Sequence, residues 1–478
     1  MSNNNFYVDI MALHKGVTGS FMPIIVHFPN KEIRTIVVDC GLFQEGEESN
    51  ELNKILPFDV HKIDHVLVTH NHVDHIGRLP FLIKNGYKGK IHVSNATSQL
   101  IRYALDDSCK VLASRAKLSG APPIYGQQHV KDTLTKIVSH NYEQCFLLED
   151  NIKVTFFMNG HLPGAVIILL QINPGSCKKR KYEPINLLFT GDYNFENMFF
   201  DVKPIPKRIY DWPITIIQEA TYGKMDSSEI KPCFEENFFS ALKAGKTIIL
   251  PVFSLGRGQE LKYILKKYQD LNLLDTSIPI FSDGTLMSNY DNIFHRHGLD
   301  NRVECRNFYP QNYTDISGNT DLRRRIVENN SQKIILAAGG MGSHGPAQFY
   351  IPEYLRRSNA LIHFTGYCAE GTLGRKLYEC ENGNITEASG LQVKKLADVQ
   401  FTSEFSAHAK ADQLIDFLRP FEKLKLLLIN HGEPDTKEVY AARVINDINP
   451  KNVGILGTHV FRVDSYGLVK SYSPESYL

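Results

Sequence analysis

The segment THNHVDHIG, residues 69–77, contains four side chains able to ligate a metal within a stretch of six residues. They are His70, His72, Asp74 and His75, and they follow the apolar run HVLV. Imidazole and carboxylate groups are ligands that suit Zn²⁺ in proteins. Chance would place this spacing in on the order of one in 10³ chains of similar histidine content. A solvated, histidine-rich loop is therefore the weaker interpretation of this segment.

A site for two ions needs more ligands than this turn supplies, and three residues beside apolar runs are candidates. His161 lies between two strand-like runs in MNGHLPGA, and Asp192 ends the run LLFTGD. His431 ends the run LLLINH. Each residue alone is as compatible with an ordinary loop as with a ligand. Because all three follow an apolar strand pattern, we interpret them as one set that completes a binuclear metal site.

Two kinds of segment must position these residues. Up to about residue 207, strand patterns such as RTIVVDCG, HVLVTH and INLLFTGD follow one another closely, as in stacked β-sheets. From about residue 212, strands such as KTIILPVF alternate with helical patterns such as GRGQELKYILKKY, which indicates βαβ units around a parallel sheet. The tail after residue 400 returns to strand, helix and strand. We expect this tail to complete the first domain, so that the middle of the chain is an insertion.

Composition places the chain among globular proteins, with 42% hydrophobic residues and a formal net charge of +1. That balance gives no chain-wide attraction to nucleic acids or membranes, so a polyanion would need a local groove. The eight cysteines include no CxxC pair, which predicts reduced thiols and a cytoplasmic location. We expect no signal peptide at MSNNNFYVDIMALHKG and no membrane span, because no apolar run approaches about eighteen residues.

Taken together, these motifs resemble the metallo-β-lactamase superfamily. Its five elements match Asp39 in VVDCGLFQ, the HxHxDH turn, His161, Asp192 and His431. The block between Asp192 and His431 resembles the β-CASP insertion of the nucleic-acid-processing branch. That branch includes ribonuclease J and the endonuclease subunit of the messenger-RNA cleavage and polyadenylation factor. QEATYGK, FSAHAKADQL and INHGEP resemble its motifs A, B and C, and PVFSLGRGQEL, AAGGMGSHGP and TGYCAEGTLGR resemble its insertion segments.

The resemblance implies an α/β protein, a metallo-β-lactamase αββα sandwich with an inserted β-CASP α/β domain. We expect residues 1–207 to form the first part of the metallo-β-lactamase domain. Residues 208–400 would form the inserted domain, and residues 401–478 would complete the sandwich.

The resemblance also implies two bound Zn²⁺ ions, with Mn²⁺ as the alternative. One ion would be held by His70, His72 and His161. The other would be held by Asp74, His75 and His431, and Asp192 would be a ligand of both. Asp39 would hydrogen-bond a ligand histidine and fix its tautomer. Catalytic roles would fall to Asp74, to His408 of motif B and to Glu219 of motif A, with Glu219 keeping His408 cationic.

Glycine-rich segments at 339–346 and 365–372 follow strand patterns and precede helical ones. Backbone N–H groups in such turns can bind phosphates. Side chains in and near the insertion segments are further candidates for phosphate or RNA contacts: Ser254, Arg257, Ser343, His344 and Ser406.

The predicted function is that of a zinc-dependent ribonuclease, endonucleolytic or exonucleolytic, acting on single-stranded RNA. The resemblance favours RNA because of His431. RNA-processing members of the branch have histidine at the matching position, whereas DNA-repair members have an aliphatic residue there. A small-molecule ester or thioester hydrolase and a non-catalytic RNA-binding paralogue are the alternatives. No membrane partner is expected, and the resemblance leaves a homo-oligomer open.

Overall fold

The computed structural model describes residues 6–44, 48–56, 58–175, 182–297, 302, 305–366 and 368–473. Two compact units form the chain: Met1–Ser227 together with Ala407–Leu478, and Ser228–Ser406. Within the described ranges, no helix has the length and apolar character needed to cross a membrane.

The observed division differs from the predicted boundaries at 207/208 and 400/401. Strand β11 (Ile214–Glu219) runs parallel to β10 (Ile185–Phe189) and to β20 (Leu424–Asn430), so it belongs to the first unit. Strand β19 (Asp398–Phe401) pairs with β16 (Ala360–Phe364), and the segment up to Ser406 stays in the second unit. The sequence does not show this division, because a buried apolar strand such as ITIIQE has the same residue pattern in either domain.

The first unit contains two β-sheets. The strand order of the first sheet is β23-β22-β1-β2-β3-β4-β5-β6, and that of the second is β21-β20-β11-β10-β9-β8-β7. The remaining bounds in the first sheet are β1 Tyr7–Ile10, β2 Met22–His27, β3 Ile33–Val38, β4 His65–Leu67, β5 Lys90–Ser94, β6 Ile137–His140, β22 Val460–Asp464 and β23 Gly467–Tyr472. Those in the second are β7 Cys145–Glu149, β8 Ile152–Met158, β9 Val166–Ile172 and β21 Val453–Ile455.

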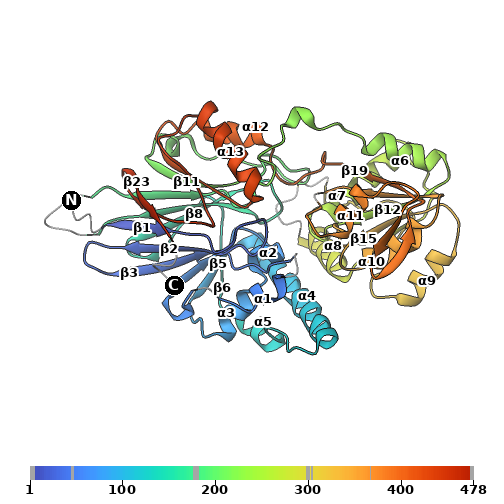
Figure 1. The fold of residues 1–478 in the computed structure, drawn as a ribbon, viewed down its shortest axis with the longest axis horizontal. Helices are drawn as coiled ribbons and strands as arrows, with labels where there is room; N and C mark the ends of the chain where they lie inside the picture. Colours follow the sequence, from blue (N-terminus) through green and yellow to red (C-terminus); the bar gives the residue numbers. More distant parts are fainter. Residues whose placement is uncertain are drawn as a thin grey trace. The chain divides into compact units, whose positions relative to one another are not determined.

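The two sheets bury one apolar core between them. Alternate residues point inward, such as Ile24 on β2 and Ile168 on β9, and both are fully buried in the same cluster. Helices cover the outer faces, and Figure 1 shows α3–α5 on one side of the unit and α12 and α13 on the other. The bounds are α1 Ser49–Leu52, α2 Val73–Ile76, α3 Leu79–Lys84, α4 Asn95–Ser119, α5 Gln127–Leu134, α12 Ala411–Leu418 and α13 Pro434–Asp447, with short 3₁₀ turns η1 Val60–Lys62, η2 Lys207–Ile209 and η3 Ser227–Glu229.

Separate apolar clusters join each helix layer to its sheet. Leu79 and Leu105 pack with strand residues of the first sheet, and Leu414 and Tyr440 pack with those of the second. The predicted αββα sandwich is therefore confirmed.

The second unit is built on a six-stranded parallel sheet of order β14-β13-β15-β12-β16-β19. Its central strands, such as TIILPV and IILAA, are buried throughout, as expected when helices cover both faces. The remaining bounds are β12 Thr247–Val252, β13 Ile280–Asp283, β14 Tyr313–Asp315, β15 Ile334–Ala338, a hairpin of β17 Ile385–Ala388 and β18 Leu391–Lys394, and helices α6 Phe234–Lys243, α7 Arg257–Asp270, α8 Thr285–His297, α9 Thr320–Glu328, α10 Ala347–Leu355 and α11 Leu373–Glu379.

Strand direction brings the predicted site residues to one edge of the sandwich. In the second sheet, β8, β10, β11 and β20 all run the same way, because β9 is antiparallel to both β8 and β10. In the first sheet, β3 and β4 are parallel. The carboxyl ends of these strands lead directly into the candidate residues: Asp39, His70, His161, Asp192, Glu219 and His431.

Candidate metal centre

The histidine-rich segment continues from the end of β4 into α2 and is held by the loops before β2 and after β3. The backbone N–H of Cys40 donates to the carbonyl of His75 at 2.7 Å, and that of Ser20 donates to the carbonyl of Asp74 at 2.9 Å. A Cβ atom on Gly41 would lie 1.4 Å from the carbonyl oxygen of Asp74, so only glycine allows this approach. The local backbone therefore fixes where the ligand side chains point.

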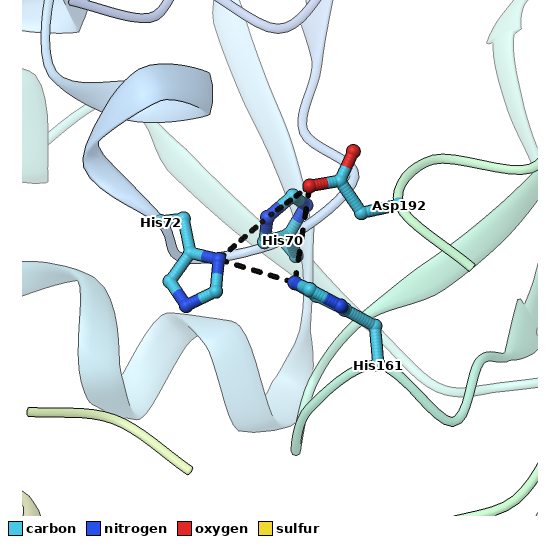
Figure 2. A group of neighbouring side chains, drawn as sticks. All are labelled: His70, His72, His161 and Asp192. Carbon is cyan, nitrogen blue, oxygen red and sulfur yellow. Dashed lines mark hydrogen bonds and ion pairs between the residues drawn. The ribbon is translucent and has the colours of Figure 1, made fainter. Parts of the chain in front are cut away.

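One group of candidate ligands consists of His70, His72, His161 and Asp192 (Figure 2). Nδ1 of His72 lies 3.2 Å from Nε2 of His70 and 3.1 Å from Nε2 of His161. Oδ2 of Asp192 lies 3.6 Å from Nε2 of His70 and 3.9 Å from Nε2 of His161. Ligands around a tetrahedral ion with bonds of about 2.0–2.1 Å stand about 3.3 Å apart. These four atoms therefore have the spacing of one metal coordination shell.

A second group consists of Asp74, His75 and His431. The Nε2 atoms of His75 and His431 lie 3.3 Å apart. Oδ2 of Asp74 lies 3.7 Å from Nε2 of His75 and 3.8 Å from Nε2 of His431. This is again the spacing of ligands around a single ion.

Asp192 connects the two groups. Its Oδ2 atom, already within reach of the first group, also lies 3.4 Å from Nε2 of His75. A carboxylate in this position has the geometry of a bridge between two ions.

Hydrogen bonds on the far side of the rings set the tautomers of the ligand histidines. Nδ1 of His161 lies 3.0 Å from the carbonyl oxygen of Ala407, which can only accept, so this nitrogen donates. Nδ1 of His75 lies 2.8 Å from Oδ2 of Asp39. In a neutral ring the opposite Nε2 atom then carries the lone pair that a metal needs. Asp39 thus lies next to a candidate ligand histidine, and its role in fixing the tautomer stays a prediction.

Burial lowers the pKa of His70 and of His161 well below the ordinary value, and lowers that of His72 to about 4. These rings are therefore neutral near pH 7, as metal ligation requires. Burial opposes the ionisation of Asp192, but the surrounding histidines outweigh it and hold its pKa well below the usual range. For His75, three nearby carboxylates outweigh burial and raise the pKa well above the ordinary value. This concentration of negative charge favours a cation.

Two of these residues have strained backbones. Asp39 has a φ of 63° and His431 a φ of 42°, in the left-handed region that non-glycine residues rarely adopt. Such strain persists only where the surrounding structure enforces it, and it is concentrated at functional sites. At both positions it turns the side chain from a strand end toward the ligand cluster.

His408 and Glu219 form a pair beside the metal groups. Nδ1 of His408 lies 2.8 Å and 3.0 Å from the two carboxylate oxygens of Glu219, and its Nε2 lies 3.9 Å from Oδ2 of Asp192. Burial would lower the pKa of His408, but the Glu219 carboxylate outweighs it and the net shift is upward. Glu219 also accepts hydrogen bonds from the backbone N–H groups of Tyr193 at 2.6 Å and Thr221 at 3.1 Å. Glu219 therefore favours the protonated form of the imidazole that faces the metal groups.

The five candidate phosphate contacts all lie in the second unit. Arg257 is buried, pairs with Glu260 and lies over the ring of Phe405 at 5.4 Å. The Ser343 hydroxyl accepts a hydrogen bond from the backbone N–H of Leu373 at 2.7 Å. Neither contact excludes a phosphate, because the Ser343 hydroxyl still has a hydrogen to donate and Arg257 has further N–H donors. The other three are Ser254, His344 and Ser406, of which His344 is exposed.

Sequence reasoning missed the residues that hold the ligands in place. The Thr69 hydroxyl lies within 3.1 Å of both Asp39 carboxylate oxygens and 3.0 Å from Nδ1 of His70. Asn159 donates to the carbonyl oxygen of Asp192 at 2.6 Å and accepts from the backbone N–H of His161 at 2.9 Å. The available signal was position, because each is a small polar residue one or two places before a ligand.

Three family models match the chain. The metallo-β-lactamase superfamily matches residues 31–125, and the Beta-Casp domain matches residues 258–377. The Zn-dependent metallo-hydrolase RNA specificity domain matches residues 392–455.

Several characterised proteins are similar in sequence. The transcription termination factor FttA of Methanosarcina mazei is 27% identical over 421 residues, which cover 83% of this chain and 63% of that protein. The chain thus spans less than two thirds of that relative. Ribonuclease TTHA0252 of Thermus thermophilus is 26% identical, covering 84% of this chain and 88% of that protein. RNase aCSPSF2 of Saccharolobus solfataricus is 26% identical, covering 94% of this chain and 83% of that protein.

The three matches occur in the order that the sequence motifs predicted, and the Beta-Casp match lies within the second unit. The ligand groups supply the His/Asp donors through which this superfamily binds divalent metal ions. The chain belongs to the metallo-β-lactamase superfamily and, within it, to the β-CASP branch.

Proposed function

We propose that this protein is a zinc-dependent ribonuclease that hydrolyses phosphodiester bonds in single-stranded RNA. The observation that carries the proposal is the shared position of Asp192. One carboxylate connects two ligand groups, and Nε2 of His408 lies 3.9 Å from the same oxygen. An acid in this position suits the 3′ oxygen that leaves a phosphodiester, whereas the thiolate that leaves a thioester does not need one.

The donor set of nitrogen and carboxylate oxygen atoms suits zinc. His70, His72 and His161 would hold one ion, Asp74, His75 and His431 the other, and Asp192 would contact both. Two bound zinc ions would make water nucleophilic at neutral pH and would neutralise charge on the phosphate. Asp39 and the Ala407 carbonyl would accept hydrogen bonds from Nδ1 of His75 and His161 and so turn the Nε2 atoms toward the ions.

The protein's own acid would act on the leaving group. As the water oxygen bonds to phosphorus, the P–O3′ bond breaks and the departing oxygen needs a proton. His408 would donate this proton from Nε2, while Nδ1 keeps its hydrogen bond to Glu219. The expected products are a 5′-phosphate and a 3′-hydroxyl.

The names of similar proteins support RNA as the substrate. Two of them are ribonucleases, and the segment 392–455 matches a domain described by RNA specificity. We propose Ser254, Arg257, Ser343, His344 and Ser406 as contacts to the RNA phosphates. Zinc as the native metal and a preference for single strands are also part of this proposal.

A gel time course on 5′- and 3′-labelled RNA, with single-stranded DNA of the same sequence, tests the proposal. We expect metal-dependent cleavage of RNA, loss of cleavage with a chelator, and slower cleavage of DNA. The variant His408→Ala should be defective, whereas His61→Ala, which changes an exposed histidine, should behave as wild type. Equal or faster cleavage of DNA would overturn the substrate assignment. RNA binding without turnover would identify a non-catalytic protein, and hydrolysis of lactones or thioesters alone would identify a small-molecule hydrolase.

A further inference from the structure

A cavity of about 330 Å³ opens on the first unit, and its lining includes Tyr193, the residue after Asp192. We call it the aromatic pocket and define it by its six central lining residues: Met158, Ile167, Tyr193, Phe195, Tyr210 and Phe417. Its volume lies at the lower end of the roughly 300–1,000 Å³ typical of small-molecule sites. It is therefore suited to one flat ring system rather than to a folded partner.

The pocket wall is connected to the proposed catalytic residues. Tyr193 directly follows Asp192, and its backbone N–H donates to Glu219 at 2.6 Å. Its carbonyl accepts from the backbone N–H of Ala409, the neighbour of His408, at 2.7 Å. These bonds hold the backbone of Tyr193 in a fixed position relative to Glu219 and His408.

The pocket presents aromatic faces. The rings of Tyr193 and Phe417 lie 4.8 Å apart at the wall. Phe195 is 44% exposed, and among the residues that the structure describes it is the only phenylalanine with a strongly exposed side chain. Exposing an aromatic ring has a free-energy cost that a stacked ligand would remove.

The charges around the pocket indicate which part of a nucleotide fits inside. The ammonium of Lys203 on the lining lies 3.7 Å from Glu143, and the carboxylate of Asp416 accepts from Arg419 at 2.9 Å. The lining therefore has no surplus charge for a phosphate. Exposed Lys207, in the segment that continues to Tyr210, can instead attract the backbone of a strand outside the pocket.

We propose that the aromatic pocket binds a nucleobase of the substrate RNA, a few nucleotides from the scissile phosphate. The inference rests on the proposed function, because it assigns a base to a strand whose phosphate lies at the metal centre. Single-stranded RNA is recognised largely by stacking splayed bases on aromatic side chains. Each such stack strengthens binding by about 5- to 150-fold. Gln413 and Asp416 provide the polar atoms at the pocket that can contact the edge of a base.

A double-mutant cycle tests the assignment. RNA affinity is measured by fluorescence anisotropy in the metal-loaded His408→Ala background, so that the RNA stays intact. One series of RNAs carries a single abasic nucleotide at successive positions along the strand. We expect one position to weaken binding by about 5- to 150-fold, and we expect Phe195→Ala to cause a similar loss with intact RNA. In Phe195→Ala the abasic site should then cause little further loss. Tyr466→Ala, which removes another exposed aromatic ring from the same unit, is the matched control and should leave the abasic profile unchanged.

Equal effects of Phe195→Ala and Tyr466→Ala, or additive losses at every abasic position, would overturn the pocket assignment. Phe195→Ala could instead weaken the binding of a proline-rich peptide and leave RNA binding unchanged. That result would also overturn the assignment and would assign the pocket to a protein partner. Cleavage of intact RNA by the wild-type protein is scored separately. Cleavage of RNA without coupling between Phe195→Ala and the abasic site would contradict only the pocket assignment. Absence of RNA cleavage would contradict the proposed function.

Discussion

Nδ1 of His408 lies 2.8 Å from the carboxylate of Glu219, although 189 residues separate the two in the chain. Glu219 ends a strand of the second sheet, and His408 begins the segment that returns from the second unit. The sandwich therefore assembles its proposed acid from both sides of the insertion. The distance also makes the protonation of His408 dependent on Glu219, which leads to the first prediction.

Glu219→Gln should move the alkaline fall of the activity profile to lower pH. His408 must be protonated to act as an acid, so activity is lost as the pH rises through its pKa. Because the Glu219 carboxylate raises the pKa of His408, removal of its charge should lower that pKa. Turnover measured between pH 5 and 9 checks this, and an unchanged profile would show that His408 is not the titrating acid.

His408→Ala should separate chemistry from metal binding. A positioned general acid contributes about 10²–10⁴-fold to rate, so we expect turnover to fall by that factor. Metal content, measured by elemental analysis, should stay at the wild-type value. If the variant loses metal, His408 is a ligand and the assignments of His408 and His431 must be exchanged.

Asp192→Ala should lose both metal ions, because Oδ2 of Asp192 is common to both ligand groups. His161→Ala should weaken mainly the binding of one ion, since the Nε2 atom of His161 belongs to the first group alone. Equilibrium dialysis followed by elemental analysis gives the stoichiometry. Full occupancy in Asp192→Ala would refute the bridging role.

Removal of metal should destabilise the first unit. A ligand present at about one hundred times its dissociation constant stabilises the state that binds it by about 2.7 kcal/mol. The buried carboxylate of Asp192 would also lose its compensating cations. Thermal unfolding with and without a chelator should show a lower midpoint for the metal-free protein, and restored zinc should reverse the shift. Identical midpoints would show that the folded protein does not depend on the ions.

A chain of three histidines should make stability depend on pH. Nδ1 of His65 lies 3.2 Å from Nε2 of His92, and Nδ1 of His92 lies 3.0 Å from Nε2 of His140. Nε2 of His65 lies 3.3 Å from the carboxylate of Glu149, the last residue of β7 in the second sheet. Burial, together with the neighbouring His65, His140 and Lys90, lowers the pKa of His92 to about 3. Burial lowers that of His140 to about 4.

The unfolded chain binds protons at these positions below about pH 6.5, whereas the folded chain does not until about pH 3–4. The free energy of unfolding should therefore be highest above pH 6.5 and should fall as the pH drops toward 4, by at most about 1.4 kcal/mol per pH unit for each histidine. In His92→Gln this fall between pH 7 and 5 should be shallower than in wild type, as measured by urea unfolding. His61→Ala is the control, and an unchanged slope in His92→Gln would contradict the prediction.

Part of this architecture could be predicted from the sequence because its signals are local. Asp192 and His431 follow apolar runs, and the carboxyl ends of parallel strands lie at one edge of a sheet. Glu219, by contrast, was assigned to the inserted domain, because nothing in ITIIQE shows that this strand pairs with β10 and β20. Pairing partners are a property of the folded chain.

The residues that support the ligands were beyond sequence analysis for the same reason. Thr69 and Asn159 each act through several hydrogen bonds, with partners up to 35 residues away. His65 and His92 are 27 residues apart and belong to no motif of the sequence. Their mutual contact arises because β4 and β5 are parallel neighbours, with Leu67 opposite His92. A pattern of one residue type at unrelated intervals does not reveal such a chain.

The interrupted first unit has a consequence for biosynthesis. Strand β1 pairs with β22, and β11 pairs with β20, so neither sheet can close before the polypeptide beyond residue 424 has emerged from the ribosome. The second unit is continuous from Ser228 to Ser406 and can fold while translation proceeds. The proposed ligand His431 follows the late strand β20, so the nascent chain lacks the full set of proposed metal ligands until this segment has emerged.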